Sequence, residues 1–154
     1  MLAEREGKRM LSTISETIFH VSLLARHLDR LDVRGIVVLM LMELGIPTKC
    51  IGFELLNRAI LLLYEDQTRC LAKDIYQQIV LTCKQNSEEQ VDQAIRDVIA
   101  KAWDSGSRRA WNWYFSYDGA DVTERPTNAD FISRLARIAE FWSFCGKGGN
   151  GTDE

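Results

Sequence analysis

The sequence of 154 residues predicts an all-α fold, a compact helical bundle that contains a helix-turn-helix. Apolar residues recur at helical spacing along most of the chain, and no segment shows the alternation that is typical of a strand. Because 46% of the residues are hydrophobic, the chain can bury one core. We therefore expect a single domain over residues 33–144, an N-terminal helical extension over 1–32 and a disordered, glycine-rich tail over 145–154.

The first helices are expected from periodicity and from their stop signals. An amphipathic helix begins near Ser12 or Ser15. Its apolar stripe must pack on the domain or on a second copy of the chain in a homodimer. A largely apolar helix over 33–44 follows and ends at the glycine and proline of 45–47. A third helix is expected over 52–65.

The helix-turn-helix is predicted between residues 71 and 103. A supporting helix over 71–83 ends at the polar residues of 84–86, and Ser87 then precedes Gln90 in the spacing of a capping box. The second helix has a buried stripe at helical spacing: Val91, Ala94, Ile95, Val98, Ile99 and Ala102. Its opposite face carries four carboxylates and one arginine, an unusual charge for approaching phosphates: Glu88, Glu89, Gln90, Asp92, Gln93, Arg96 and Asp97.

A last helix is expected after the polar loop that contains Pro126. Thr127 can cap this helix, with Asp130 at the third position. Its core face repeats at helical spacing: Phe131, Ile132, Leu135, Ile138 and Phe141. The aromatic cluster before the loop, over 111–117, is interpreted as packing rather than as a platform for stacking bases, since few basic residues accompany it.

Composition argues against several classes of function. The two histidines and four cysteines show no metal-ligand or redox spacing, so we expect no metal site and no cofactor. An enzyme is disfavoured because no phosphate loop or nucleophile elbow is present. The N-terminus lacks a signal peptide, and the longest apolar run, 36–42, is far shorter than the roughly 20 residues of a membrane-spanning helix. A cytoplasmic protein without a membrane partner is expected.

Several short motifs, in their order and spacing, resemble the DNA-binding effector domain of the sporulation stage-zero master response regulator of endospore-forming bacteria. The resemblance covers roughly residues 33–142. The motifs that carry it are Glu43-Leu-Gly-Ile-Pro47, Gly52-Phe-Glu-Leu-Leu56, Arg58-Ala-Ile60, Val91, Ala94-Ile95-Arg96, Ala102-Trp103, Ser105-Gly106, Pro126-Thr-Asn128 and Phe131-Ile132.

The resemblance implies a six-helix bundle that binds promoter DNA and touches RNA polymerase. It also implies that bases are contacted from the positions of Gln90, Asp92 and Gln93, with Arg96 one turn further on. The family has arginines in place of both glutamines, a serine in place of Glu89 and a glutamate in place of Asp92, so the DNA target is expected to differ. The receiver domain that precedes the effector domain in that regulator has no counterpart before residue 33.

Two functional interpretations remain open from the sequence. In the first, the protein is a sequence-specific regulator that binds double-stranded DNA. The candidate DNA contacts are Glu89, Gln90, Asp92, Gln93 and Arg96 near the bases, with Lys84, Ser87, Arg108 and Arg109 for the phosphates. In the second, a degenerate helix-turn-helix binds a protein partner or dimerises, because an acidic helix face suits a basic protein surface better than DNA.

Overall fold

The computed structural model describes residues 32–85, 87–116 and 119–148, and all of the regular structure in these ranges is helical. The all-α prediction is therefore confirmed. The elements in chain order are α2 (Val33–Glu43), α3 (Ile51–Glu65), the π-helix η1 (Leu71–Tyr76), α4 (Gln77–Thr82), α5 (Glu88–Ser105), α6 (Arg108–Phe115) and α7 (Asn128–Gly148).

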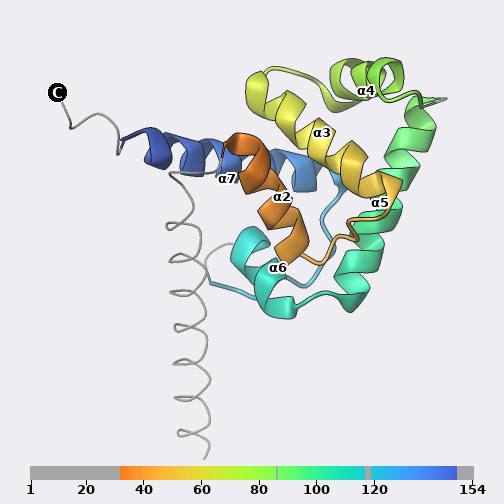
Figure 1. The fold of residues 1–154 in the computed structure, drawn as a ribbon. Helices are drawn as coiled ribbons and strands as arrows, with labels where there is room; N and C mark the ends of the chain where they lie inside the picture. The colour runs from red at the N-terminus through yellow and green to blue at the C-terminus, as the bar shows by residue number, and fades with distance from the viewer. Residues whose placement is uncertain (1–31, 86, 117–118, 149–154) are drawn as a thin grey trace, which may run out of the picture.

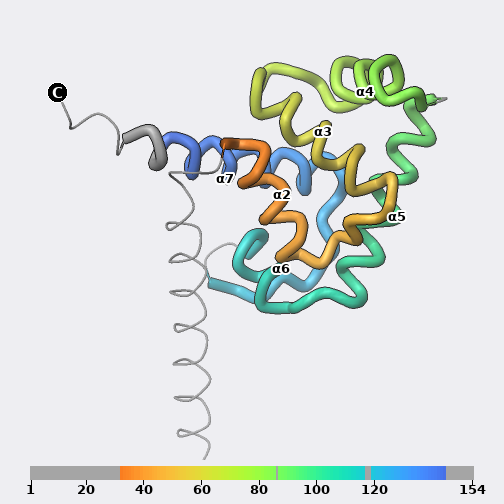
Figure 2. The backbone as a smooth tube through the Cα atoms, viewed as in Figure 1, coloured from red at the N-terminus to blue at the C-terminus, as the bar shows by residue number. Residues whose placement is uncertain are grey.

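The bundle is built around α3, which packs against α2, α5 and α7 (Figure 1). The backbone trace shows η1 and α4 at one end of α5 and α6 near its other end (Figure 2). One core joins these helices, and its largest fully buried side chains include Trp111, Tyr114, Phe131, Met40 and Leu55. The position of α5 at the side of the bundle leaves one of its faces open to solvent.

The predicted stop after α2 is confirmed. Gly45 has φ of +85°, the left-handed conformation that glycine adopts without strain. The backbone N–H of Ile46 then donates to the carbonyl of Leu41 over 3.0 Å, which satisfies a carbonyl at the end of the helix. The side chain of Ile46 is only 2% exposed, so the turn also contributes to the core.

The contact between α3 and α5 depends on a second glycine, Gly52. A Cβ atom at this position would lie 2.5 Å from Cγ1 of Val98 and 2.8 Å from the carbonyl oxygen of Ala94. Only a residue without a side chain allows α5 to approach α3 this closely. The absence of a side chain at Gly52 therefore helps to determine how closely α5 packs on α3.

Three residues of the aromatic cluster, Trp111, Tyr114 and Phe115, lie on α6 and pack in the core as interpreted from the sequence, whereas Trp113 is 36% exposed and residue 117 lies outside the described residues. The ring of Trp111 lies 5.4 Å from that of Phe115, and Phe115 stacks at 5.2 Å on Phe131 of α7. On α2, a carboxylate oxygen of Glu43 accepts a hydrogen bond of 2.5 Å from the hydroxyl of Tyr114. These contacts attach α6 to both α2 and α7.

Two expectations about α7 need correction. Phe141 was expected on the core face, yet its side chain is 61% exposed. At this turn Trp142 packs against the core instead, and Ser143 accepts a hydrogen bond from the hydroxyl of Tyr64 on α3. The helix also continues to Gly148, so its last turn includes residues that were assigned to the disordered tail from 145 onward. The expected extension over 1–31 and residues 149–154 lie outside the described residues.

Candidate nucleic-acid interface

The segment predicted as the supporting helix consists of a π-helix, η1, followed directly by α4. Its first turn is held by Asp74, whose carboxylate accepts a 2.6 Å hydrogen bond from the backbone N–H of Cys70. The chain leaves α4 through Lys84, which is exposed and has φ of 54°. A left-handed residue is common where a helix ends, and here it turns the chain toward α5.

The predicted start of α5 is confirmed. The hydroxyl oxygen of Ser87 accepts a hydrogen bond of 3.2 Å from the backbone N–H of Gln90, so Ser87 is the N-cap. Glu88 and Glu89 occupy the first turn, where carboxylates stabilise a helix through its dipole. Since Ser87 accepts with its oxygen, its O–H is still able to donate to another group.

The solvent face of α5 carries four of the predicted DNA-contacting residues together. Glu89, Gln90, Gln93 and Arg96 are all exposed. The amide of Gln93 donates to a carboxylate oxygen of Asp97 over 2.8 Å and accepts a long hydrogen bond of 3.4 Å from Arg96. These contacts are made at the surface, where water or a ligand can replace them.

Asp92 differs from these neighbours because its side chain faces the bundle. One carboxylate oxygen accepts hydrogen bonds from the hydroxyl of Tyr76, at 2.9 Å, and from the side-chain amide of Asn128, at 3.0 Å. The other oxygen pairs with the guanidinium of Arg96 at 2.6 Å. Its oxygens are thus engaged within the protein, which separates Asp92 from the exposed residues with which the sequence grouped it.

Tyr76 and Asn128 hold Asp92 in the candidate interface, and the sequence analysis did not include them in it. The side chain of Asn128 is 8% exposed, and its amide also donates to the backbone carbonyl of Asp92 over 2.9 Å. Burial, with the hydrogen bond to Asp92, raises the pKa of Tyr76 well above its usual value, so this phenol stays a donor at neutral pH. The start of α7 and the π-helix therefore both hold α5.

The sequence indicated the helix cap that precedes Asn128 but not the contact of Asn128 with α5. Thr127 caps α7 as predicted, with its hydroxyl oxygen accepting from the backbone N–H of Asp130 over 3.2 Å. The sequence motif around the cap gave no indication that the next residue would reach α5.

The predicted phosphate contacts do not lie together. Lys84 and Ser87 flank the beginning of α5. Arg108 lies near its other end, where its guanidinium is 4.5 Å from the ring centre of Trp103 and donates to the carbonyl of Val122 over 3.5 Å. At 1.5 Å per residue, Trp103 is about 24 Å along the helix axis from Ser87. Arg109 is exposed beside Arg108, so these two arginines belong to a different part of the surface.

A comparison with protein families matches residues 37–138 to the model of the C-terminal domain of the sporulation initiation factor Spo0A. The chain belongs to this family. The Spo0A C-terminal domain is a DNA-binding effector domain, which agrees with the resemblance found in the sequence. The matched range begins within α2 and ends within α7, so it contains the whole segment that was predicted as a helix-turn-helix.

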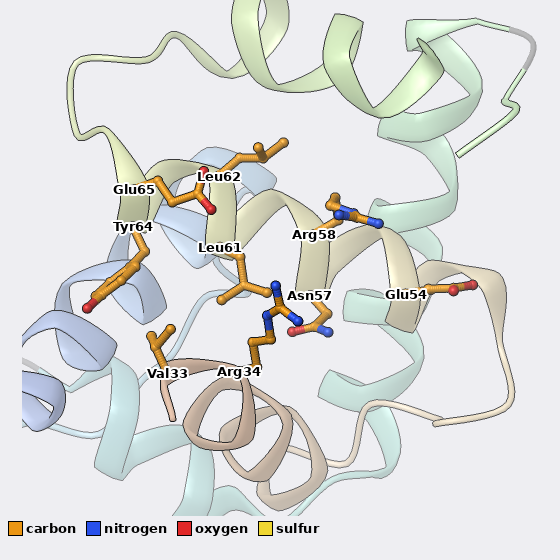
Figure 3. A pocket seen from close by; sticks show the side chains of 9 residues that line it. All are labelled: Val33, Arg34, Glu54, Asn57, Arg58, Leu61, Leu62, Tyr64 and Glu65. Atoms are coloured by element: carbon orange, nitrogen blue, oxygen red, sulfur yellow. The ribbon is translucent and has the colours of Figure 1, made fainter. Parts of the chain in front are cut away.

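Two cavities lie on the described surface of this Spo0A-type domain. The larger, about 430 Å³, lies along α3 next to the start of α2, where Arg34 points toward Asn57 and Leu61 (Figure 3). It is remote from the exposed face of α5. The smaller, about 340 Å³, is lined by Asp92 and Arg96 of α5 itself. Only the smaller cavity is continuous with the candidate interface.

Across the described ranges, no helix is long and apolar enough to cross a membrane. Among these same residues, no group of three or more histidine, cysteine, aspartate or glutamate side chains is placed to hold a metal ion.

Proposed function

We propose that this protein is a transcriptional regulator that binds specific DNA sequences by placing α5 in the major groove. The observation that carries the proposal is the capped beginning of α5, from which Glu89, Gln90 and Gln93 extend into solvent. In helix-turn-helix proteins the N-terminal residues of the second helix contact base edges. Membership in the Spo0A C-terminal family supports the same function.

The exposed residues suggest a division of roles. Gln90 and Gln93 have side-chain amides that can form paired hydrogen bonds with adenine, whereas an arginine would favour guanine. Lys84 and Ser87, beside the start of α5, are placed to contact phosphates. Asp92 positions Arg96 and the helix rather than contacting a base, because its carboxylate is already hydrogen-bonded.

The test is selection of bound duplexes from a random pool at low salt, followed by sequencing. We expect an enriched motif that contains adenine at the position opposite Gln93. Gln93→Ala should weaken selection at that position, whereas Arg137→Ala, on an exposed part of α7, should leave the motif unchanged. Failure to enrich any motif, with a normal helical circular-dichroism spectrum, would contradict the proposal.

Binding of a basic protein partner is the second candidate, and the charge of α5 favours it. Over residues 88–97 of α5, Arg96 is the one basic residue, and it is paired with Asp92. Glu89 and Asp97 are exposed, and Lys101 follows one turn after Asp97. Carboxylates repel phosphates and attract basic protein surfaces. A Glu89→Gln, Asp97→Asn variant separates the two functions: it should bind DNA more tightly if DNA is the partner and bind a basic protein less tightly if protein is.

RNA polymerase and a second copy of the chain are proposed as additional partners. Trp113 of α6 is 36% exposed, in the region that the family resemblance associates with polymerase. Phe141 and Phe144 on α7 are 61% and 77% exposed, which is the kind of apolar surface that a homodimer would cover. A Phe141→Ser, Phe144→Ser variant should be monomeric by light scattering at concentrations at which the wild type dimerises.

A further inference from the structure

The cavity of about 340 Å³ beside α5 brings together three separate segments of the chain. Asp92, Arg96 and Ile99 come from α5, and Leu71 comes from the beginning of η1. The rest of the lining is the stretch from Arg125 to Ala129, which leads into α7. The cavity is therefore located where the supporting helix, the exposed helix and the last helix meet.

The charge around this cavity is positive on balance. Arg96 and Arg125 contribute two guanidinium groups, and Asp92 contributes the one carboxylate of the lining. That carboxylate already receives hydrogen bonds from Tyr76 and Asn128 in addition to its pairing with Arg96. Arg96 and Asp92 balance each other as an ion pair, so the lining has a net charge of +1, and Arg125 supplies the excess positive charge that an entering anion meets.

Arg125 has no role in holding the described fold together. Its side chain is exposed, and no hydrogen bond or ion pair joins it to another described residue. It follows the exposed residues 123 and 124 and precedes Pro126, whose ring restricts the backbone. An arginine that is held at a cavity edge without a partner is available for an external anion.

The location matches the path of a DNA backbone. When the second helix of a helix-turn-helix lies in the major groove, the first helix crosses the sugar-phosphate backbone. Leu71 marks the beginning of that first helix, and Arg96 lies on the flank of α5 that faces it. A strand bordering the groove would therefore pass the mouth of this cavity.

We propose that the cavity is the binding site for a backbone phosphate of the target duplex, with Arg125 and Arg96 as its ligands. This inference rests on the proposed DNA-binding function and adds Arg125, which lies outside the helix-turn-helix, to the interface. Guanidinium groups suit phosphate oxygens because they donate paired hydrogen bonds. The proposal also explains how an acidic α5 approaches DNA: the attraction comes from beside the helix instead of from its exposed face.

The experiment measures the affinity of the full chain for its selected duplex by fluorescence anisotropy at several salt concentrations. Arg125→Ala should lower the affinity about tenfold at low salt and reduce the slope of log K against log salt by about 0.9, the value expected for one lost phosphate contact. Arg137→Ala is the matched control, because it removes the same charge from an exposed position about 14 Å along α7 from Asn128. Both variants should have the thermal stability of the wild type.

The outcomes separate this inference from the function on which it rests. If Arg125→Ala binds like Arg137→Ala while the wild type binds its duplex, the phosphate site is wrong and DNA binding stands. If Arg125→Ala changes the selected motif and leaves the salt slope unaltered, the residue contacts a base, and the inference is equally wrong. If the wild type binds no duplex, both proposals fail together.

Discussion

Asn128 attaches the start of α7 to α5, and replacing it tests whether this contact positions the candidate interface. Asn128→Ala removes the amide that donates to the backbone carbonyl and to the carboxylate of Asp92, at 2.9 and 3.0 Å. Leaving a buried polar group without its partner costs about 1–3 kcal/mol. We therefore expect the free energy of unfolding to fall by about 2 kcal/mol, which for a chain of this size lowers Tm by about 4–8 °C.

The measurement is urea unfolding followed by circular dichroism, with Ser133→Ala on the exposed side of α7 as the control. Asn128→Asp is a more specific test, because it keeps the shape of the side chain and places a second carboxylate next to that of Asp92. It should be less stable than Asn128→Ala at pH 7 and should recover stability as the pH is lowered and one carboxylate becomes protonated. A loss below about 0.5 kcal/mol for Asn128→Ala, within the range of ordinary surface changes, would refute this account of how α5 is held.

Three further predictions concern local features. Gly52→Ala should cost about 1–3 kcal/mol, because the new methyl group would lie 2.5 Å from Val98; a variant as stable as the wild type in urea unfolding would show that α5 moves away freely. Ser87→Ala should cost about 1 kcal/mol through loss of the N-cap, measured in the same way, and an unchanged midpoint would assign the capping to another group. Tyr76 and Tyr114 have pKa values raised by burial, so the stability that their protonated forms contribute is complete below the usual tyrosine pKa and is lost as the pH rises above it. Absorbance at 295 nm should show these two phenols ionising only together with alkaline unfolding, and ionisation before unfolding would contradict their burial.

Much of the fold could be predicted because its signals are local. The end of α2 follows from the glycine at 45 and the proline at 47, and the start of α5 follows from the serine at 87, since caps and stops depend on residues within one turn. The periodicity of α7 was also correct up to Leu135, which is fully buried. It failed at Phe141 because apolar residues occupy both sides of the helix at this turn, and Trp142 rather than Phe141 packs against the core.

The candidate site was less predictable because its decisive contacts are not local. Asp92 and Asn128 are 36 residues apart and meet only after α5 and α7 have packed. Position on a helical wheel placed Asp92 with the solvent face, although it lies on the edge next to the core. Arg125 belongs to a loop without periodicity, so its proximity to Arg96 could be recognised only from the arrangement of the helices.

The salt dependence of DNA binding follows from the number of phosphates that the protein contacts. If Lys84, Arg108, Arg109 and Arg125 each contacted one phosphate, log K would change with log salt by a slope of about −3.6, so that raising salt from 50 to 200 mM would weaken binding about a hundredfold. Proteins with six to ten phosphate contacts lose roughly a thousandfold to a hundred-thousandfold over the same range. Because the exposed carboxylates of α5 add repulsion that salt would screen, the measured slope should be still shallower. A shallow slope means that little of the binding energy is electrostatic. We therefore expect most of the affinity to come from contacts that do not depend on salt, and a second copy docked through Phe141 and Phe144 would strengthen binding further by presenting two DNA-binding surfaces together.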